Sequence, residues 1–198
     1  MKIILASGSP RRKELFSLFG MDYTICAPHV DETITEDESP EVFCKRISMK
    51  KTALIYGKNT DSLVIGADTI VVLDGMILGK PDCAKKACDF LKILQDRCHE
   101  VFTAYTIMKN HMHITRMIRS KVYFRHMRDE EIQWYVSTGE PMDKAGAYAV
   151  QGIGALFIDR IDGSYTNVIG LPVAELYNDL KDFGLVLNRQ EDRQWQDM

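Results

Sequence analysis

The sequence predicts a mixed α/β (α+β) protein in which helices flank a twisted, mixed sheet. Short apolar runs of strand length alternate with amphipathic stretches of helix length. Hairpin signals such as Asp74-Gly75 join predicted strands directly, which argues against an all-parallel sheet. The chain has 198 residues, 45% of them hydrophobic, and can bury one substantial core. We therefore expect one domain over residues 1–184 and a polar C-terminal tail over 185–198.

Serine followed by proline marks two helix starts in the first half of the chain. Serine suits the N-cap, and proline suits the first helical position. A near-continuous apolar run is typical of a strand buried on both faces. In chain order we expect a strand over 3–6, a helix from Ser9-Pro10 to Gly20, a helix from Ser39-Pro40 to about Tyr56, and a central strand over 63–73.

Turn residues divide the second half into shorter elements. Asp74-Gly75 predicts a hairpin with 76–78 as its return strand. Asp82 is placed to cap a helix, because its carboxylate can accept a hydrogen bond from the first turn. The remaining expected elements are strands over 100–108 and 112–125, a helix from Arg128 to Thr138 closed by Gly139, a strand over 155–161, and a helix from Leu171-Pro172 stopped by Gly184.

The composition excludes some classes of partner. Lys and Arg number 25 and Asp and Glu number 28, a net charge of −3, whereas proteins that bind long nucleic acids usually carry a basic excess. No apolar run approaches the ~20 residues needed to span a bilayer. The five cysteines are an odd number without a CxxC pair, which favours reduced thiols. We expect a cytoplasmic protein that binds no nucleic-acid polymer and no membrane.

The segment from Ala6 to Arg12, Ala-Ser-Gly-Ser-Pro-Arg-Arg, is the first candidate for a functional site. A strand leads through small residues into a helix N-terminus, where backbone N–H groups and the helix dipole attract a phosphate. Arg11 and Arg12 oppose that dipole, so a binding role would explain their position. The alternative is a capped helix with two solvated arginines.

A second candidate, Gly66-Ala67-Asp68-Thr69, lies inside the most apolar predicted strand. A carboxylate is costly there unless it is paired, bound to a metal or facing a cleft. Gly66 and Ala67 would let a ligand approach the backbone closely. The alternative is an edge strand on which Asp68 faces water.

Further candidates have weaker local patterns. Lys80 follows a predicted strand, Lys51 lies on the second predicted helix, and Glu32 could supply a metal ligand. The stretch 138–152 is rich in Gly and Ala and could approach a ligand closely. Within it, Gln151 offers both a donor and an acceptor to the edge of a base. The alternatives are solvated charges and an ordinary loop.

Taken together, these segments resemble the Maf family of nucleotide pyrophosphatases. Six short motifs occur in the family's order between residue 2 and about residue 184, and their combination is specific although each alone is weak. The matching pieces are Leu5–Arg12, Val30–Glu32, Gly66–Thr69, Gly79–Pro81, Asp143–Tyr148 with Gln151-Gly152, and Gly163–Tyr165 with Val168–Pro172.

The resemblance implies a Maf/ITPase-like fold with two lobes around a deep central cleft. It implies hydrolysis of a nucleoside triphosphate to the monophosphate and pyrophosphate with a divalent cation, Mg²⁺ or Mn²⁺. Gln151 and the Asp143–Tyr148 motif look like the branch that acts on dTTP and UTP, and modified pyrimidine nucleotides would suggest a house-cleaning role. Ala149 stands where this branch commonly has glycine, which is tolerable if its φ is negative.

The same resemblance implies roles by position. Asp68 matches the catalytic proton acceptor, and Asp68 and Glu32 would lie near the metal. The other matching positions bind substrate: Arg11, Thr69 and Gln151 tune substrate choice, and Ser7, Arg12, Lys51 and Lys80 line the phosphate cleft.

Two other functions stay open. The family is also associated with arrest of cell division and septum formation, so the protein could be a non-catalytic nucleotide-binding regulator. It could also be a purine house-cleaning pyrophosphatase of similar fold, which would prefer ITP or XTP. The resemblance gives a small-molecule nucleotide as the partner and is compatible with a homodimer.

Overall fold

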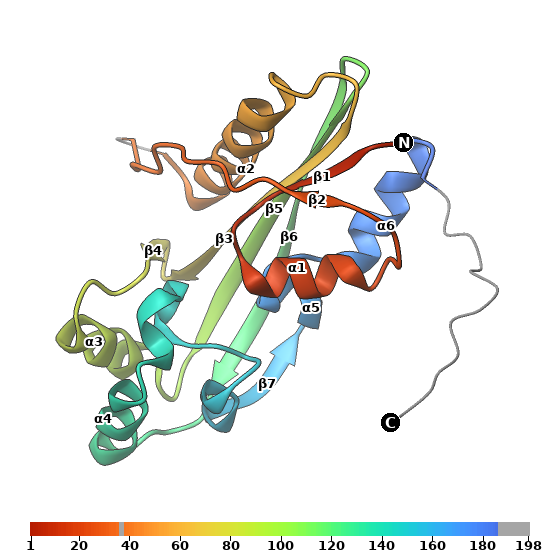
Figure 1. Cartoon of the computed structure of the whole chain (residues 1–198). Coiled ribbons are helices and arrows are strands. Elements are labelled where there is room, and N and C mark those ends of the chain that lie inside the picture. The colour runs from red at the N-terminus through yellow and green to blue at the C-terminus, as the bar shows by residue number, and fades with distance from the viewer. Residues whose placement is uncertain (36–37, 186–198) are drawn as a thin grey trace, which may run out of the picture.

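The structure, a computed structural model, describes residues 1–35 and 38–185. In these residues seven strands form one sheet in the order β2-β1-β3-β5-β6-β7, with β4 paired to β3 beside this path (Figure 1). The strands are β1 (Ile3–Ala6), β2 (Thr24–Ile25), β3 (Leu63–Leu73), β4 (Met76–Leu78), β5 (Cys98–Lys109), β6 (Met112–Phe124) and β7 (Ile158–Asp162). The α-helices are α1 (Pro10–Ser17), α2 (Pro40–Tyr56), α3 (Ala84–Leu94), α4 (Asp129–Ser137), α5 (Tyr165–Ile169) and α6 (Val173–Asp182). Three 3₁₀ turns complete the set: η1 (Glu140–Asp143), η2 (Ala145–Ala147) and η3 (Ile153–Phe157).

The sheet is mixed, as the sequence predicts. Strand β1 runs parallel to β2 and β3, whereas the β3–β4, β3–β5, β5–β6 and β6–β7 pairs are antiparallel. The long β5–β6 hairpin turns through Asn110 and His111, whose φ angles are 49° and 62°. Positive φ at two central residues matches the twist of a two-residue hairpin loop.

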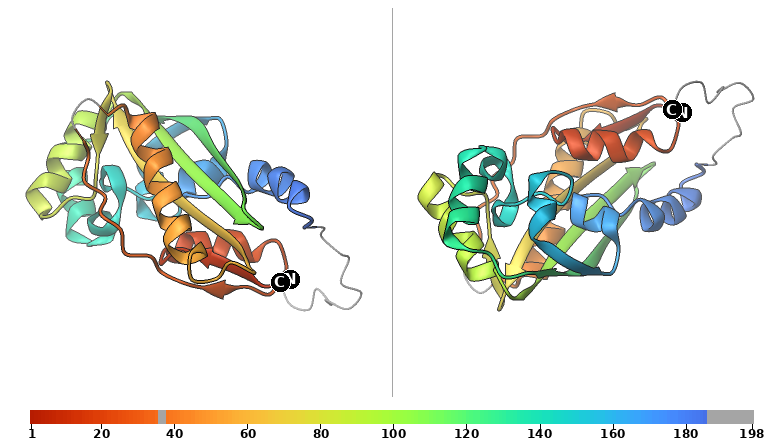
Figure 2. Two further views of the ribbon diagram at one scale, coloured as in Figure 1. Left: turned by 90° about the horizontal axis from the view of Figure 1, so that it is seen from above. Right: turned by 90° about the horizontal axis from the view of Figure 1, so that it is seen from below.

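Helices cover both faces of the sheet (Figure 2). Alternate residues of a strand point to opposite faces. On one face, Ile70 and Val72 of β3 pack against Phe43 and Ile47 of α2. On the other face, the apolar residues of β1, β3 and β5 form a core with α1, α5 and α6.

A further core lies at the other end of the long strands. Val71 of β3, Val101 of β5 and Val122 of β6 pack there against residues of α3, α4 and the 3₁₀ turns. The helices therefore form two groups, with α1, α2 and α6 near β1 and with α3 and α4 near β4 (Figure 1). The long strands, β3 above all, connect the two groups.

Several predicted elements differ from the structure. Helix α3 begins at Ala84 with Cys83 at the N-cap, so the prediction of Asp82 as the cap is wrong. The Asp82 carboxylate instead pairs with Lys86 at 3.1 Å, one turn along the helix. Strand β7 begins at Ile158 rather than at 155, because the residues before it form η3. Strand β2 has only two exposed residues, too few to give a periodic pattern.

One residue that the sequence analysis assigned to the C-terminal tail packs in the core. Leu185, assigned to the tail, is 2% exposed and belongs to the core beneath α6. Residues 186–198, the rest of the predicted tail, lie outside the described residues.

Within residues 1–35 and 38–185, no helix combines the length and the apolar character that a membrane crossing requires.

Candidate active site

The loop after β1 forms one wall of the site. Ser9 caps α1, with its Oγ accepting from the Arg12 N–H at 3.5 Å, and Ser7 Oγ accepts from the Ser9 N–H at 3.2 Å. Pro10 is the first helical residue, as the sequence predicts. Helix α1 has no acidic residue in its first turn, so Arg11 and Arg12 supply the charge there.

A gap beside β3 creates the opening of the site. Strand β1 pairs with β3 only as far as Gly66, and β4 pairs with β3 only from Val71 onward. Among the described strands, residues 67–70 therefore have no partner on that edge. Asp68 and Thr69 lie in this gap, and strand alternation points their side chains to opposite faces.

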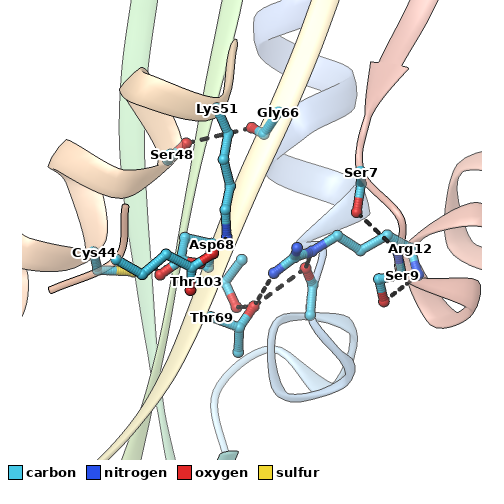
Figure 3. A network of polar contacts seen from close by, with 12 residues as sticks. Ser7, Ser9, Arg12, Cys44, Ser48, Lys51, Gly66, Asp68, Thr69 and Thr103 are labelled. Atoms are coloured by element: carbon cyan, nitrogen blue, oxygen red, sulfur yellow. Dashed lines mark hydrogen bonds and ion pairs between the residues drawn. The ribbon is translucent and has the colours of Figure 1, made fainter. Parts of the chain in front are cut away.

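Asp68 is buried and paired, so the alternative of an edge residue facing water is excluded. Its residue exposure is 5%, and its Oδ1 lies 2.7 Å from Nζ of Lys51 on α2 (Figure 3). The same Nζ lies 2.8 Å from Oε1 of Glu32, whose side chain is 53% exposed. Lys51 thus draws the two carboxylates toward one point.

Close packing of α2 on β3 places Lys51. Ser48 donates to the Gly66 carbonyl at 3.3 Å, and Cys44 Sγ donates to the Asp68 carbonyl at 3.5 Å (Figure 3). A Cβ on Gly66 would lie 2.4 Å from Thr52 Oγ1, so only glycine fits beneath the helix. Burial raises the pKa of the Cys44 thiol to about 12, which leaves it protonated as a hydrogen-bond donor.

Arg12 occupies the opposite face of β3. Its Nη2 donates to Thr69 Oγ1 and its Nε donates to the Gly170 carbonyl, both at 2.8 Å. Thr69 in turn shares a hydrogen bond of 2.9 Å with Thr103 on β5. Burial lowers the pKa of Arg12, and the Asp68 carboxylate opposes that shift. Thr69 and Gly170 thus hold the guanidinium in one orientation, and its remaining N–H groups are available to a phosphate.

Two adjoining hollows open around these residues. The main hollow has a polar end, which includes Arg11, Arg12, Lys51, Asp68 and Lys80. Its other end is largely apolar, because Val71, Val101, Tyr148 and Val168 belong to one apolar cluster there, with Ala149 and Val150 following Tyr148 in the chain. Ile169 also lines the hollow, as does Gly170, whose carbonyl accepts from Arg12 Nε at 2.8 Å. The adjoining hollow lies against the loop Ala6–Arg12 and shares Glu32, Lys51 and Lys80 with the main one.

Eight of the nine site residues expected from the sequence line these hollows. They are Ser7, Arg11, Arg12, Glu32, Lys51, Asp68, Thr69 and Lys80. Gln151 is exposed and does not line either hollow, although Val150 beside it does. Ala149 is not among the residues with positive φ, so the condition for replacing glycine there is met.

The apolar end of the main hollow has no counterpart among the sequence-predicted site residues. Its residues come from β3, β5, the η2–η3 loop and α5. Tyr148 and Val168 belong to motifs that carry the family resemblance, although neither was named as a site residue, whereas Val71 and Val101 read as ordinary core. The Gly- and Ala-rich pattern of 138–152 was the signal available for the loop, which contributes Asp143 to Ala145 and Tyr148 to Val150. No local signal marked Val71 or Val101.

The donor set at the polar end fits a hard divalent cation held together with a substrate. Within the described residues there is no cluster of three or more His, Cys, Asp or Glu side chains that could hold a metal alone. Mg²⁺ usually keeps several waters and binds one or two carboxylates plus substrate phosphates. Asp68 and Glu32, which converge on Lys51, are such a pair.

Comparison with solved structures confirms the fold class. A HAM1 protein from Coxiella burnetii superposes with a TM-score of 0.56, covering 92% of this chain and 99% of that chain at 12% identity. The Ham1 protein of Staphylococcus aureus gives 0.52, covering 93% and 100% at 14% identity. At such low identity, the likeness concerns the fold alone.

Curated relatives are similar along nearly the whole chain. A dTTP/UTP pyrophosphatase of Syntrophus aciditrophicus (strain SB) is 49% identical over 185 residues, 92% of this chain and 90% of that protein. One of Dictyoglomus turgidum is 45% identical over 189 residues, 94% of this chain and 98% of that protein. The family model described as "Maf-like protein" matches residues 2–183. The chain therefore belongs to the Maf family.

Proposed function

We propose that this protein hydrolyses nucleoside triphosphates, dTTP and UTP in particular, to the monophosphate and pyrophosphate. The observation that carries the proposal is the buried Asp68–Lys51 pair, which lies in a hollow with a basic end and an apolar end. The relatives named dTTP/UTP pyrophosphatase support the same activity. Modified pyrimidine triphosphates such as 5-methyl-UTP are further proposed substrates, which would give the enzyme a house-cleaning role.

The two ends of the main hollow suggest how the nucleotide lies. Arg11, Arg12 and Lys80 would hold the triphosphate by charge-assisted hydrogen bonds. The base would enter the apolar end, against the loop that carries Tyr148 and Val150. Ser7, in the adjoining hollow, would contact the phosphates.

The reaction proposed is attack of water on the α-phosphorus. The new bond joins the water oxygen to that phosphorus, the bond to the bridging oxygen of the β-phosphate breaks, and pyrophosphate leaves with the electron pair. Asp68 accepts the proton of the attacking water, and Lys51 holds its carboxylate in place at 2.7 Å. The cationic side chains stabilise the charge on the leaving group.

A divalent cation, Mg²⁺ or Mn²⁺, would be held by Asp68 and Glu32 together with substrate phosphates. When bound, such a cation neutralises phosphate charge and polarises the phosphoryl oxygens. Chelation with EDTA should therefore abolish pyrophosphate release, and added Mg²⁺ or Mn²⁺ should restore it.

Substrate choice would depend on Thr69 and Gln151. Thr69 holds Arg12 and so sets where the phosphates lie relative to the base end. Gln151 follows Val150, which lines the main hollow, and we propose that its amide contacts the base in the bound state. A site that pairs with the polar edge of one base strongly rejects others, because its buried groups would stay unpaired.

A panel of purified triphosphates tests the reaction. Pyrophosphate release from dTTP and UTP, well above that from ITP, XTP and the common purine triphosphates, is expected. No release from any of them, with thermal stabilisation by nucleotide, would favour a non-catalytic regulator. Preference for ITP or XTP would favour a purine house-cleaning enzyme.

Replacement of the proposed proton acceptor tests the mechanism. Asp68→Asn keeps the size of the side chain but removes its basicity, so kcat for dTTP should fall by at least about 100-fold. Binding of dTTP, measured by calorimetry with calcium as the cation, should persist. Near wild-type turnover in this variant would disprove the role of Asp68.

The remaining proposals concern the setting of the enzyme. The odd number of cysteines without a CxxC pair favours a reducing compartment, and we place the activity in the cytoplasm. The partner proposed is a small nucleotide rather than a nucleic-acid polymer. Light scattering tests for a homodimer, which would have twice the 22.6 kDa mass of one chain.

A further inference from the structure

The loop from Tyr148 to Gly154 forms one wall of the main hollow and is anchored from behind by two side chains. Tyr148, Ala149 and Val150 line the hollow. Behind them lie Tyr135 of α4, which is fully buried, and Glu140 of η1. Neither Tyr135 nor Glu140 lines either hollow of the described chain.

Four hydrogen bonds join these two side chains to each other and to both ends of the loop. Glu140 Oε1 accepts from the Gly154 N–H at 3.0 Å and from the Tyr135 hydroxyl at 2.8 Å. Glu140 Oε2 accepts from the Ile153 N–H at 3.0 Å. The Tyr135 oxygen accepts from the Ala149 N–H at 3.3 Å.

The loop backbone lies close against Glu140 and Tyr135 at two glycines. A Cβ on Gly152 would lie 2.5 Å from Glu140 Oε2. A Cβ on Gly154 would lie 2.6 Å from both the Tyr135 hydroxyl and the Ala149 carbonyl oxygen. The backbone therefore approaches both side chains closely, and at Gly154, where the backbone of Ala149 is also close, only glycine fits.

The anchor is charged. Burial raises the pKa of Glu140, but hydrogen bonds from the Gly154 and Ile153 N–H groups and the Tyr135 hydroxyl, with the charge of Lys144, lower it by more, so that the resulting pKa is below its usual value. Burial and the nearby Glu140 raise the pKa of Tyr135, which stays protonated as a donor. Hydrogen bonds to an ionised carboxylate are about twice as strong as neutral ones.

We propose that Glu140 and Tyr135 are positioning residues that set the shape of the base-binding wall, and so the discrimination among nucleotide bases. This inference rests on the proposed function. Tyr148, Ala149 and Val150 line the hollow, while the Ala149 N–H donates to Tyr135 behind them. The wall keeps a shape that fits one base only when its residues are held in place in this way. Discrimination then depends on residues that the base never touches.

The chain offers a matched control for the test. Tyr105 is also fully buried and also donates to a carboxylate, Asp179 Oδ2, at 2.6 Å, but it lines neither hollow. Tyr135→Phe and Tyr105→Phe each remove one hydroxyl from the same kind of pair. Urea unfolding should show a similar loss of stability in both, whereas only Tyr135→Phe loosens the loop.

The experiment measures kcat and KM separately for dTTP, UTP, dATP and GTP in the full chain. For Tyr135→Phe we expect KM for dTTP to rise about fivefold, the factor for ~1 kcal/mol of the lost hydrogen bond from the Ala149 N–H of the loop, with kcat within about twofold. The preference for pyrimidine over purine, as a ratio of kcat/KM values, should narrow by a similar factor. Tyr105→Phe should leave both quantities unchanged.

Substitutions of Glu140 provide a graded test. Glu140→Gln keeps one carbonyl acceptor but turns an amide toward the Ile153 N–H, and Glu140→Ala removes both acceptors. The pyrimidine preference should therefore fall in the order wild type, Glu140→Gln, Glu140→Ala. An unchanged preference in Tyr135→Phe and Glu140→Gln would overturn the inference. So would an equal loss of kcat for all four nucleotides with KM unchanged.

Failure of the proposed function would be recognised separately. If the wild-type protein released pyrophosphate from none of the four nucleotides, the hydrolase proposal would fail. The positioning inference would then be judged from calorimetric Kd values for the same nucleotides and variants. A selective weakening of dTTP and UTP binding in Tyr135→Phe would support it, and an unchanged pattern would overturn it.

Discussion

Asp68 illustrates how a single residue can conflict with its local pattern and so mark a site. A carboxylate within Val-Ile-Gly-Ala-Asp-Thr-Ile-Val-Val is unfavourable unless something compensates its burial. The structure supplies Lys51 at 2.7 Å and a gap in the pairing of β3. The conflict was visible in the sequence, whereas the identity of the partner was not.

Glu140 and Tyr135 show the opposite case at the same scale. Neither conflicts with its local pattern, since Tyr135 falls on the apolar face of α4 and Glu140 follows a helix-ending glycine. Their contact with the loop joins residues 13 or 14 positions apart through side chain and backbone. Such contacts leave no mark on the pattern of neighbouring residues.

His99 gives a prediction about pH. Burial lowers the pKa of His99 to about 3, whereas the unfolded chain titrates near 6.5. Between these pH values the unfolded state binds more protons than the folded state. The contribution of His99 to the free energy of unfolding is therefore fully present above about pH 7 and is lost as the pH falls. Wild type should lose about 2 kcal/mol more of its unfolding free energy than His99→Gln between pH 7 and pH 5. Urea unfolding at both pH values measures this difference.

The difference between wild type and His99→Gln separates the effect of His99 on the pH dependence of stability from the effect of the carboxylates. Glu38 and Glu131 have pKa values of about 2, lowered by hydrogen bonds from Arg46 and Arg125, and they titrate alike in both proteins. Equal pH slopes in wild type and His99→Gln would show that His99 does not titrate on unfolding.

At the scale of elements, the close approach of α2 to β3 positions the chemistry. Strand β3 supplies Asp68 and α2 supplies Lys51, and they meet because Gly66 lets the helix descend onto the strand. The sequence predicted both elements with the bounds observed, Pro40 to Tyr56 and Leu63 to Leu73. The sequence predicted that a ligand could approach the backbone at Gly66, but the structure places Thr52 of α2 there instead.

Substitution at this contact should uncouple the two elements. In Gly66→Ala the new methyl group would lie 2.4 Å from Thr52 Oγ1 and 3.2 Å from its backbone nitrogen, so α2 must move. We expect a loss of about 1–3 kcal/mol in unfolding free energy and a fall in kcat as Lys51 leaves Asp68. Gly57→Ala is the control, because its Cβ would meet only Ala53 O, at an ordinary 3.4 Å.

Calorimetric melting and turnover of Gly66→Ala and Gly57→Ala test whether the contact of α2 with β3 places Lys51 beside Asp68. Gly57 has a φ of −57°, so alanine there should leave stability equal or slightly higher. If Gly66→Ala melted and turned over like Gly57→Ala, the close helix–strand contact would have no part in placing Lys51.

At the scale of the whole molecule, the net charge of the chain differs in sign from the charge that lines the main hollow. A total of −3 argues against long polyanions, yet the main hollow gathers five basic side chains and three acidic ones, a local charge of +2. The basic residues are Arg11, Arg12, Lys51, Lys80 and Lys144, and the acidic ones are Glu32, Asp68 and Asp143. A substrate the size of one nucleotide meets this local charge rather than the total.

The boundary of the folded unit can be tested by truncation. Leu185 is 2% exposed and its N–H donates to the Leu180 carbonyl at 3.1 Å, whereas the family match ends at residue 183. A chain ending at residue 184 should unfold about 1.5–3 kcal/mol more easily than one ending at 185. Thermal unfolding compares the two, and equal stability would place the boundary before Leu185.

The sequence by itself determined most elements, the mixed sheet and, through six ordered motifs, the family. These depend on caps, turns and apolar periodicity, which are properties of neighbouring residues. Only the tertiary structure decided the gap beside β3, the convergence of Glu32 and Asp68 on Lys51, and the anchor behind the loop. Arg12 and Gly170 meet across 158 positions of chain, and such contacts follow from how the elements pack, which no local pattern records.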